Sequence, residues 1–428
     1  MENERKLLKV GVVGIGRGRS VMRYANGTKQ CELVAICDIW EEGLERMKAD
    51  MEKQGRHLAY YTKFEEFLKH DMDVVCLANY ATEHAPLAVQ ALDAGFHVFS
   101  ECLPAQTMAE AVALVEAVER SGKKYCFLEN ACYMPGVLEI KRLFEEGTIG
   151  EFEYGEGEYC HNCEGIWTEL THGGDPNHWR NQMYTSFYCT HSIGPLISVT
   201  GLRPTSVVGV QLPNIDRMRN MGRKGGVAAL EIIRLNNGGV YKSLHGELYS
   251  HSLWWSFYGN KGRMETCRED VQMGDTNRVC MDVFKVPGDY DDPTNHVTMS
   301  YIPVDKYSKR AKAFGHSGAD FYTLWNAMEY ILGNEDAKII DVYQAIDMWI
   351  PGLFAHFSAL EGSKELAIPD LRDPAQRDAY RNDNRCTNPE KAGDQLIPCH
   401  HWGEEDIPQE VWDRFKEDWE KKGHPNTV

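Results

Sequence analysis

Residues 9–20 read KVGVVGIGRGRS, a short apolar run that passes into a glycine-rich turn. Glycines in such a turn permit a tight bend and let backbone N–H groups approach a pyrophosphate, which lies at the positive end of the following helix. Arg19 stands where Gly or Ala is usual, so the match to the common pattern is incomplete. The stretch still predicts a strand, a dinucleotide-binding turn and a helix. The residues expected to contact the cofactor here are Gly14, Gly16, Arg17, Gly18, Arg19 and Ser20.

A second strand is predicted over residues 32–38 and closes on Asp38. This acid follows the turn by about 20 residues, the spacing at which a carboxylate binds the ribose hydroxyls of an adenine dinucleotide. Its charge would repel a 2′-phosphate, which favours NAD over NADP. The strand–turn–helix–strand order favours this interpretation over that of a solvated acid at a strand end.

Strands and helices continue to alternate as far as residue 130. Further strands are predicted at 73–79, 97–100 and 124–128, and helices at 84–93 and after the capping box Thr107–Glu110. This order predicts a doubly wound parallel α/β sheet, a Rossmann domain over residues 1–130, whose ligand lies at the carboxyl ends of the strands. The cofactor contacts expected outside the turn are Asp38, Asn79, His84, Glu101 and Asn130.

The pattern changes after residue 150. Residues 151–161 alternate as a half-exposed strand does, and Asn236–Gly239 separates two later strand candidates as a hairpin turn. We therefore expect a second, α+β domain over residues 131–365 with an open, mainly antiparallel sheet. Residues 366–428 are polar and rich in turns, and form a C-terminal extension with a helix predicted near 408–421.

Composition excludes several classes of protein. The 428 residues carry a formal charge of −18, which repels phosphate backbones and anionic lipids and so disfavours nucleic-acid and membrane partners. The charged N-terminal residues run directly into a strand and do not resemble a signal peptide. The thirteen cysteines lack the spacing of a small disulfide scaffold. We expect a reduced, cytoplasmic protein.

Four segments carry a family resemblance: VGVVGIGRGRS, VAICD, AGFHV and GTIGEF. Together they resemble the Gfo/Idh/MocA oxidoreductase family, over roughly residues 5–365. The resemblance implies an NAD-binding Rossmann domain and a C-terminal domain whose open sheet shapes a sugar site. It also implies a carbohydrate or glycoside substrate and a homo-oligomer, a dimer or tetramer.

The departures from the family pattern are informative. Dehydrogenases of the family usually have Glu-Lys-Pro after the strand at 97–100, but this chain reads Ser100-Glu101-Cys102-Leu103-Pro104. They usually also carry an Asp four residues before the site histidine, where this chain has Phe187. Both usual proton-handling partners are therefore missing.

Other segments resemble the NAD-dependent α-N-acetylgalactosaminidase branch of the family. The matching motifs are Ser100-Glu101, Glu129-Asn130-Ala131-Cys132-Tyr133, His178-Trp179-Arg180 and Tyr188-Cys189-Thr190-His191. Carried over by motif, Glu101, Trp179 and Arg180 border the nicotinamide and its ribose. The residues expected to line the sugar are Tyr133, His178, Tyr188 and His191.

In that branch a bound NAD⁺ takes hydride from a sugar hydroxyl carbon, and the resulting ketone acidifies the neighbouring C–H. Loss of that proton eliminates the aglycone. Water then adds, and the hydride returns to the sugar. His and Tyr side chains suit the proton transfers, and paired carboxylates are not required. We expect His191 and Tyr188 to act directly, with Tyr133 and His178 assisting. Two alternatives stay open: a net sugar dehydrogenase that releases a keto-sugar, and a non-catalytic sugar or NAD sensor.

Two further groups have weaker functional interpretations. Cys160-His161-Asn162-Cys163 lacks a second ligand pair and alternates along a strand, so no metal site is expected. His316 and Asp320 open a predicted helix, where either sugar contact or helix capping would suit them.

Overall fold

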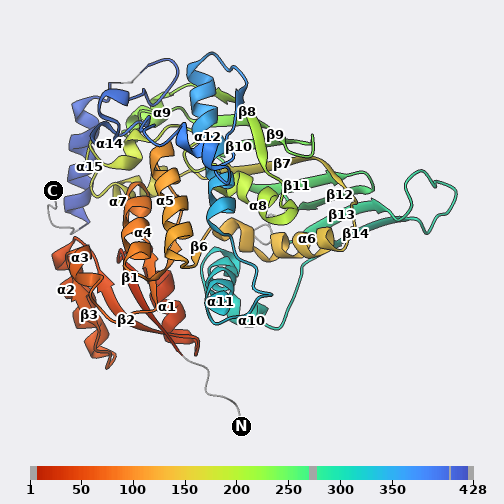
Figure 1. The fold of residues 1–428 in the computed structure, drawn as a ribbon. Helices are drawn as coiled ribbons and strands as arrows, with labels where there is room; N and C mark the ends of the chain where they lie inside the picture. Colours follow the sequence, from red (N-terminus) through yellow and green to blue (C-terminus); the bar gives the residue numbers. More distant parts are fainter. Residues whose placement is uncertain (1–6, 269–276, 404–405, 423–428) are drawn as a thin grey trace, which may run out of the picture. The chain divides into compact units, whose positions relative to one another are not determined.

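The computed structural model describes residues 7–268, 277–403 and 406–422. The chain forms two compact units, and both are assembled from separate stretches of sequence (Figure 1). Unit 1 comprises residues 1–135, 304–346 and 371–382, and unit 2 comprises residues 136–303, 347–370 and 383–428. The predicted boundaries, 1–130, 131–365 and 366–428, instead followed the order of the sequence.

Unit 1 contains the predicted parallel sheet. Its six strands lie in the order β3 (Ala59–Tyr61), β2 (Cys31–Cys37), β1 (Leu8–Val13), β4 (Val74–Leu77), β5 (His97–Ser100) and β6 (Tyr125–Phe127). The connecting helices include α1 (Arg19–Gly27), α2 (Glu41–Lys53), α3 (Phe64–Phe67), α4 (His84–Asp93) and α5 (Met108–Ser121). All four residues of β4 are buried, as expected for a central strand covered on both faces.

The later stretches join unit 1 through specific contacts. Helices α10 (Ser308–Ala311), α11 (Ala319–Ile331) and α13 (Pro374–Asp378) come from them. Lys124 Nζ donates a hydrogen bond to the Tyr330 carbonyl oxygen at 2.8 Å. Arg377, which is buried, donates to Glu119 on α5 at 2.7 Å. Sequence order alone gave no indication of these pairings.

Unit 2 contains a nine-stranded sheet. Its order is β14 (His296–Tyr301), β13 (Val279–Phe284), β12 (Gly262–Thr266), β11 (Ser252–Gly259), β7 (Phe152–Cys160), β10 (Val240–Gly246), β9 (Ala228–Leu235), β8 (Pro204–Gln211) and β15 (Leu366–Ala367). The pairs are antiparallel except β7 with β10, which are parallel. The predicted hairpin between β9 and β10 is present, and the expected open, mainly antiparallel sheet is confirmed.

Helices cover one face of this sheet. Helix α8 (Thr190–Thr200) contacts β7, β10 and β11. The backbone of α12 (Val342–Leu360) lies close to Gly209 of β8, where a Cβ added to this glycine would lie 2.0 Å from the Ala355 carbonyl oxygen. The remaining helices of unit 2 are α6 (Pro135–Glu145), α7 (Trp167–Leu170), α9 (Asp216–Asn220), α14 (Pro389–Ala392) and α15 (Gln409–Lys421). Across the described ranges, no helix is both long and apolar enough to span a membrane.

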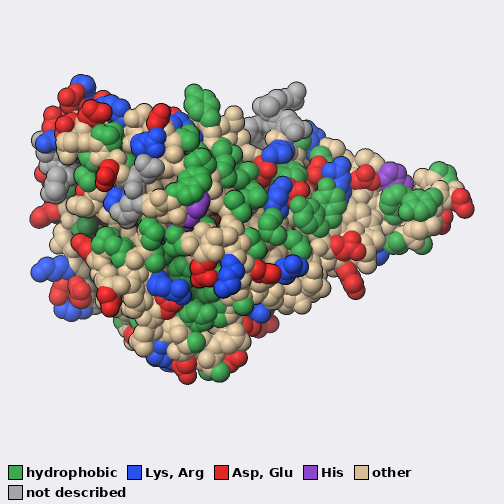
Figure 2. Space-filling view, turned by 90° about the horizontal axis from the view of Figure 1, so that it is seen from above, with side chains coloured by type: hydrophobic (Ala, Val, Ile, Leu, Met, Phe, Trp, Pro, Cys, Tyr) green, Lys and Arg blue, Asp and Glu red, His purple; other side chains and the backbone are tan. Residues whose placement is uncertain are grey.

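The β13–β14 hairpin extends from the sheet of unit 2, and hydrophobic and histidine side chains gather near its end in Figure 2. Phe284 stacks on His296 with ring centroids 4.6 Å apart, and Tyr290 packs on Phe284 while remaining 78% exposed. These ring contacts supply packing for a hairpin that has little other core.

Candidate functional site

The glycine-rich turn of unit 1 has the geometry that a dinucleotide needs. Gly14 has φ +92°, and an added Cβ there would lie 2.5 Å from the Ala78 carbonyl oxygen. A Cβ on Gly18 would lie 2.1 Å from the Gly14 oxygen. Gly16 is exposed, and a Cβ on it would meet no atom within 4 Å, so this backbone faces open space. Two glycines therefore make the bend and the third lets a phosphate approach, as the sequence predicts.

Asp38, at the end of β2, holds this turn from the neighbouring strand. Its carboxylate accepts hydrogen bonds from the backbone N–H groups of Ile15 at 2.8 Å and Trp40 at 2.9 Å. A carboxylate has about four acceptor positions, so ribose hydroxyls can be bound in addition. Arg19 begins α1 and is exposed, and the Ser20 hydroxyl donates to the Arg17 carbonyl oxygen at 3.1 Å.

Arg17 belongs to a charged network at the carboxyl edge of the parallel sheet. Its Nε donates to Glu101 Oε1 at 2.8 Å, and its two terminal nitrogens donate to Asp320 at 2.9 and 3.0 Å. Asn130 Nδ2 donates to the same Asp320 at 3.3 Å, and His316 Nδ1 lies 2.9 Å from it. Three predicted cofactor residues, Arg17, Glu101 and Asn130, are thus brought together by an acid from the first turn of α11.

The charges in this network are stabilised by pairing. Burial works to raise the pKa of Asp320, but hydrogen bonds from His316 and Arg17 outweigh it, so the pKa lies well below its ordinary value. Burial raises the pKa of Glu101, and the charge of Arg17 opposes that rise. Asp320 is 4% exposed, so its ion pair with Arg17 is protected from solvent screening.

Two other predicted cofactor residues follow β4. Asn79 Nδ2 donates to Glu83 at 2.8 Å. His84, the first residue of α4, is buried and donates from Nδ1 to the Leu103 carbonyl oxygen at 3.0 Å. Burial lowers the pKa of His84 to about 4, so this ring is neutral near pH 7. His84 therefore ties the start of α4 to the segment that follows Glu101.

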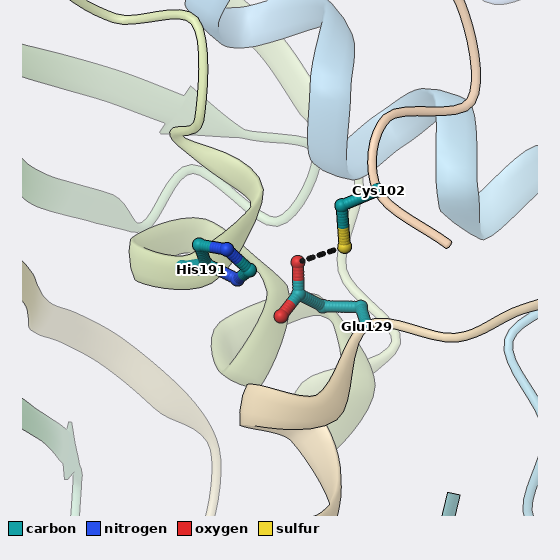
Figure 3. A group of neighbouring side chains, drawn as sticks. All are labelled: Cys102, Glu129 and His191. Atoms are coloured by element: carbon teal, nitrogen blue, oxygen red, sulfur yellow. Dashed lines mark hydrogen bonds between the residues drawn. The ribbon is translucent and has the colours of Figure 1, made fainter. Parts of the chain in front are cut away.

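Cys102 lies in the segment where dehydrogenases of the family that this sequence resembles usually carry a lysine. Cys102 Sγ donates to Glu129 Oε2 at 3.2 Å, drawn as the dashed line in Figure 3. Glu129 is fully buried and also accepts from the Ala131 N–H at 3.1 Å. Burial and then the charge of Glu129 raise the pKa of the Cys102 thiol well above its ordinary value. This pair offers a neutral thiol instead of a cation.

Tyr133 lies in the short 3₁₀ turn after β6. Its hydroxyl donates to the Lys338 carbonyl oxygen at 3.0 Å, and the side chain is buried. Burial raises the pKa of Tyr133 well above its ordinary value. The contact gives this phenol a structural bond within unit 1, and its assisting role in catalysis stays a prediction.

In unit 2, the predicted residues His178, Trp179 and Arg180 lie together at the start of a 3₁₀ turn. His178 Nδ1 accepts from the Arg180 N–H at 3.3 Å, so the neutral ring carries its proton on Nε2. Burial, followed by the charges of His172 and Arg180, lowers the pKa of His178 to about 3. The Arg180 guanidinium lies over the Trp179 ring at 4.5 Å and over Tyr188 at 5.5 Å.

The other two predicted residues, Tyr188 and His191, form a ring pair at the start of α8. Their planes differ by 2° and their centroids lie 5.6 Å apart. Tyr188 also contacts Trp179, with centroids 6.2 Å apart. Unit 2 therefore brings five of the predicted residues together: ring contacts link His178, Trp179, Tyr188 and His191 in a row, and the Arg180 guanidinium lies over two of these rings.

Two residues of this cluster were not foreseen from the sequence. Tyr159, near the end of β7, places its ring 4.3 Å from His191, and its hydroxyl shares a hydrogen bond of 3.2 Å with His161 Nδ1. His245 on β10 is in register with Tyr159, and the two rings stack at 5.7 Å. Burial lowers the pKa of His245 to about 3, and its Nδ1 donates to the Thr185 carbonyl oxygen. The only sequence signal for Tyr159 was the alternation of 151–161, which indicates a face and not a partner.

Comparisons with known proteins agree with this geometry. Residues 8–129 match the model of the Gfo/Idh/MocA oxidoreductase family, described as an NAD-binding Rossmann fold. A glycosyl hydrolase family 109 protein of Shewanella putrefaciens is 25% identical over 391 residues, which cover 85% of both chains. A second such protein, of Shewanella sp. strain MR-4, is 26% identical over 411 residues and 87% of both chains.

Solved structures of sugar-related oxidoreductases share the fold. Levoglucosan dehydrogenase in complex with NADH and L-sorbose has a TM-score of 0.65 and 16% identity, covering 85% of this chain and 100% of that one. An oxidoreductase of Agrobacterium radiobacter in complex with NAD⁺, L-tartaric acid and magnesium has a TM-score of 0.67 and 14% identity, covering 86% and 99%. The comparisons bear out the resemblance seen in the sequence: residues 8–129 are similar to the NAD-binding Rossmann domain of the Gfo/Idh/MocA oxidoreductase family, and most of the chain shares the fold of such oxidoreductases.

Proposed function

We propose that this protein is an NAD-dependent glycoside hydrolase that oxidises a sugar hydroxyl transiently and restores it before product release. The observation that carries the proposal is the contact of Tyr188 and Tyr159 with the His191 ring in unit 2. The curated relatives named glycosyl hydrolase family 109 support it. The segment Ser100–Pro104, which holds no lysine, supports it further.

When bound, NAD⁺ accepts a hydride from a sugar hydroxyl carbon and returns it at the end of the turnover. His191 takes the proton of that hydroxyl as the C=O bond forms. One tyrosine of the group, Tyr188 or Tyr159, which has given its hydroxyl proton to a neighbouring base, then takes the proton of the acidified C–H as the phenolate, and the electron pair forms a C=C bond as the anomeric C–O bond breaks. The leaving oxygen takes up a proton, water adds across the C=C bond, and reversal of the first step restores the hydroxyl. The sum is hydrolysis with no net oxidation.

The environment of these rings suits proton transfer. His191 lies at a helix start between two tyrosines, and an imidazole has one ring nitrogen that can accept a proton and one that can donate it, so it can serve both steps of one cycle. A tyrosine hydroxyl needs a neighbour to become a base, and His161 is hydrogen-bonded to Tyr159 for that purpose. His178, neutral through its low pKa, would donate from Nε2 to a sugar oxygen.

One experiment tests this proposal against its alternatives. Purified protein is incubated with aryl α- and β-glycosides, with and without added NAD⁺, while aglycone release and reduced nicotinamide are followed by absorbance. Aglycone release without net reduction of NAD⁺ is the expected result. Stoichiometric reduced cofactor would instead establish a sugar dehydrogenase, which the fold shared with levoglucosan dehydrogenase favours. If a broad glycoside panel gives neither signal, a sugar or NAD sensor is the better conclusion.

Two further properties are part of the proposal. All thirteen cysteines are free thiols, which is consistent with a reducing, cytoplasmic setting. The family resemblance implies a homo-oligomer. Light scattering coupled to size exclusion should give a mass of two or four times 48.7 kDa, and a mass of one chain would contradict the oligomer.

A further inference from the structure

Helix α15 of the C-terminal extension packs against the loop that carries His178, Trp179 and Arg180. Figure 1 shows α15 beside α7, and the two helices are in contact. Phe415 on α15 is buried, and Trp419 is half-buried one helical turn later. Residues four apart lie on the same side of a helix, so these two aromatic side chains form one apolar face. The extension therefore binds unit 2 through defined side chains.

Two glycines in the loop leave room for the aromatic side chains of α15. An added Cβ on Gly173 would lie 2.9 Å from the Trp419 ring, and one on Gly174 would lie 2.4 Å from Phe415. Both glycines have positive φ, +83° and +76°, and the preceding His172 has φ +49°. Residues other than glycine adopt this backbone region uncommonly, although histidine does so more often than most, and such conformations persist where surrounding contacts impose them. The contacts that surround residues 172–174 include α15.

Polar contacts hold α15 at its C-terminal end and near its middle. Lys422, just past the helix, donates to Glu169 on α7 at 2.5 Å. Near the middle of the helix, Arg414 donates to the Asn220 carbonyl oxygen. Both partners belong to unit 2, so the helix is fixed to the unit that carries the candidate sugar residues.

A continuous row of ring contacts runs from α15 to the candidate catalytic pair. Trp419 stacks on His172 with centroids 6.4 Å apart, and His172 lies 5.5 Å from His178. His178 lies 5.7 Å from Trp179, which contacts Tyr188. Loss of the first ring would leave His172 without its neighbour on the α15 side and would loosen the turn that places His178.

We propose that α15 is a positioning element of the substrate site and that Trp419 is its main positioning residue. The helix fixes the loop over residues 171–182 in the conformation that presents His178, Trp179 and Arg180. That this loop contacts substrate rests on the proposed function. That α15 keeps the loop ordered does not depend on the proposed function.

The test compares Trp419→Ala, Trp419→Phe and the matched control Lys416→Ala, an exposed position on the same helix. Hydrogen–deuterium exchange of residues 171–182 is measured in the full chain, together with NAD⁺ affinity and kcat/KM for a cleaved aryl glycoside. We expect Trp419→Ala to raise exchange in this loop at least tenfold and to lower kcat/KM at least tenfold. NAD⁺ binding should weaken in the same variant, because Trp179 and Arg180 on this loop are expected to border the nicotinamide. Trp419→Phe should bring all three quantities back close to their wild-type values, and Lys416→Ala should change none of them.

The outcomes separate the two proposals. Unchanged exchange in Trp419→Ala would overturn the role of α15, and so would raised exchange with unchanged kcat/KM. If the wild-type chain cleaves no glycoside, the proposed function fails, while the exchange measurement still decides whether α15 orders the loop. Trp419→Leu replaces Trp419→Ala in the same comparison if circular dichroism shows that the alanine variant does not fold.

Discussion

The network around Arg17 in unit 1 and two buried groups of unit 2, His178 and Glu231, differ in how their ionisable side chains are treated. In unit 1, Arg17, Glu101 and Asp320 form a charged network in which the pKa of Asp320 is held well below its ordinary value. In unit 2, burial lowers the pKa of His178 to about 3 and raises that of Glu231, a fully buried residue of β9, to about 8. These unit 2 groups are neutral near pH 7. The Arg17 network holds its charges by pairing them, whereas burial keeps His178 and Glu231 uncharged.

The difference fits the tasks that we propose for these two groups of residues. A dinucleotide carries phosphate charge and a cationic ring, so fixed and paired charges beside the glycine turn give it a defined orientation. A neutral group can gain or lose a proton during a reaction, which is the role proposed for the imidazole between the tyrosine rings. The contrast predicts that substitutions of Tyr188 and His191 in unit 2 change turnover, whereas substitutions beside the glycine turn of unit 1 change cofactor binding.

The largest effect is expected for His191→Ala. Loss of a general acid–base group typically costs about 10²- to 10⁴-fold in rate. We expect kcat to fall at least about 1,000-fold, because the same imidazole serves in both directions of hydride transfer. The NAD⁺ dissociation constant, measured by calorimetry, should stay within about twofold because no charge of unit 1 is altered.

Tyr188→Phe removes only the hydroxyl and should also abolish most turnover while cofactor binding persists. His296→Ala and Tyr290→Phe, both on the β13–β14 hairpin, are the matched controls and should retain full activity. If His191→Ala and Tyr188→Phe both remain active, the assignment of the ring group as proton-handling residues is wrong.

The next effect concerns the neutral interior of unit 2. Burial raises the pKa of Glu231 from 4.5 to about 8, although the Ser243 hydroxyl opposes the shift. Below about pH 4.5 the side chain is protonated in the folded and unfolded states alike. As the pH rises to 8, the Glu231 carboxyl ionises in the unfolded chain but stays protonated in most of the folded chain. The free energy of unfolding therefore falls progressively over this pH range. Glu231→Gln removes this loss and should gain about 3 kcal/mol of unfolding free energy at pH 8 relative to pH 5.

Urea unfolding at the two pH values, followed by tryptophan fluorescence, measures that difference. Glu153→Gln, an exposed position on β7, is the control and should show no such dependence on pH. If Glu231→Gln raised the free energy of unfolding by the same amount at pH 5 and pH 8, Glu231 would be ionised in the folded protein. The contrast with the charged network of unit 1 would then not hold.

Local sequence signals predicted much of the fold. The Thr107–Glu110 capping box starts α5 where expected, with Thr107 accepting from the Glu110 N–H, and the predicted strand at 97–100 is β5. These elements can be predicted because the residues that determine them lie close together in the sequence. Strands β12 and β13 were not predicted, since their pairing depends on partners elsewhere in the sheet and their sequences alternate weakly.

The candidate site was predictable only where its residues are close in sequence. Tyr188 and His191 are one helical turn apart, so their pairing follows from local spacing. Tyr159 joins them because β7 lies beneath α8, and Asp320 reaches Arg17 from 303 positions further along the chain. A single sequence gives residue types at such positions but not which of them meet.

The smallest of the three effects is expected for Asp38→Ala, which tests the charged unit. The carboxylate accepts hydrogen bonds from the turn and would accept the ribose hydroxyls as well. A hydrogen bond to a charged group contributes about 1.5–3 kcal/mol, so NAD⁺ binding should weaken about 10- to 100-fold. Repulsion of a 2′-phosphate disappears with the same charge, so NADP⁺ binding should weaken far less or improve. The ratio of the two dissociation constants is therefore the measurement, with Asp50→Ala on α2 as the control. A purely structural role for Asp38 would weaken both cofactors equally, and an unchanged ratio would show that specificity for NAD arises elsewhere in unit 1.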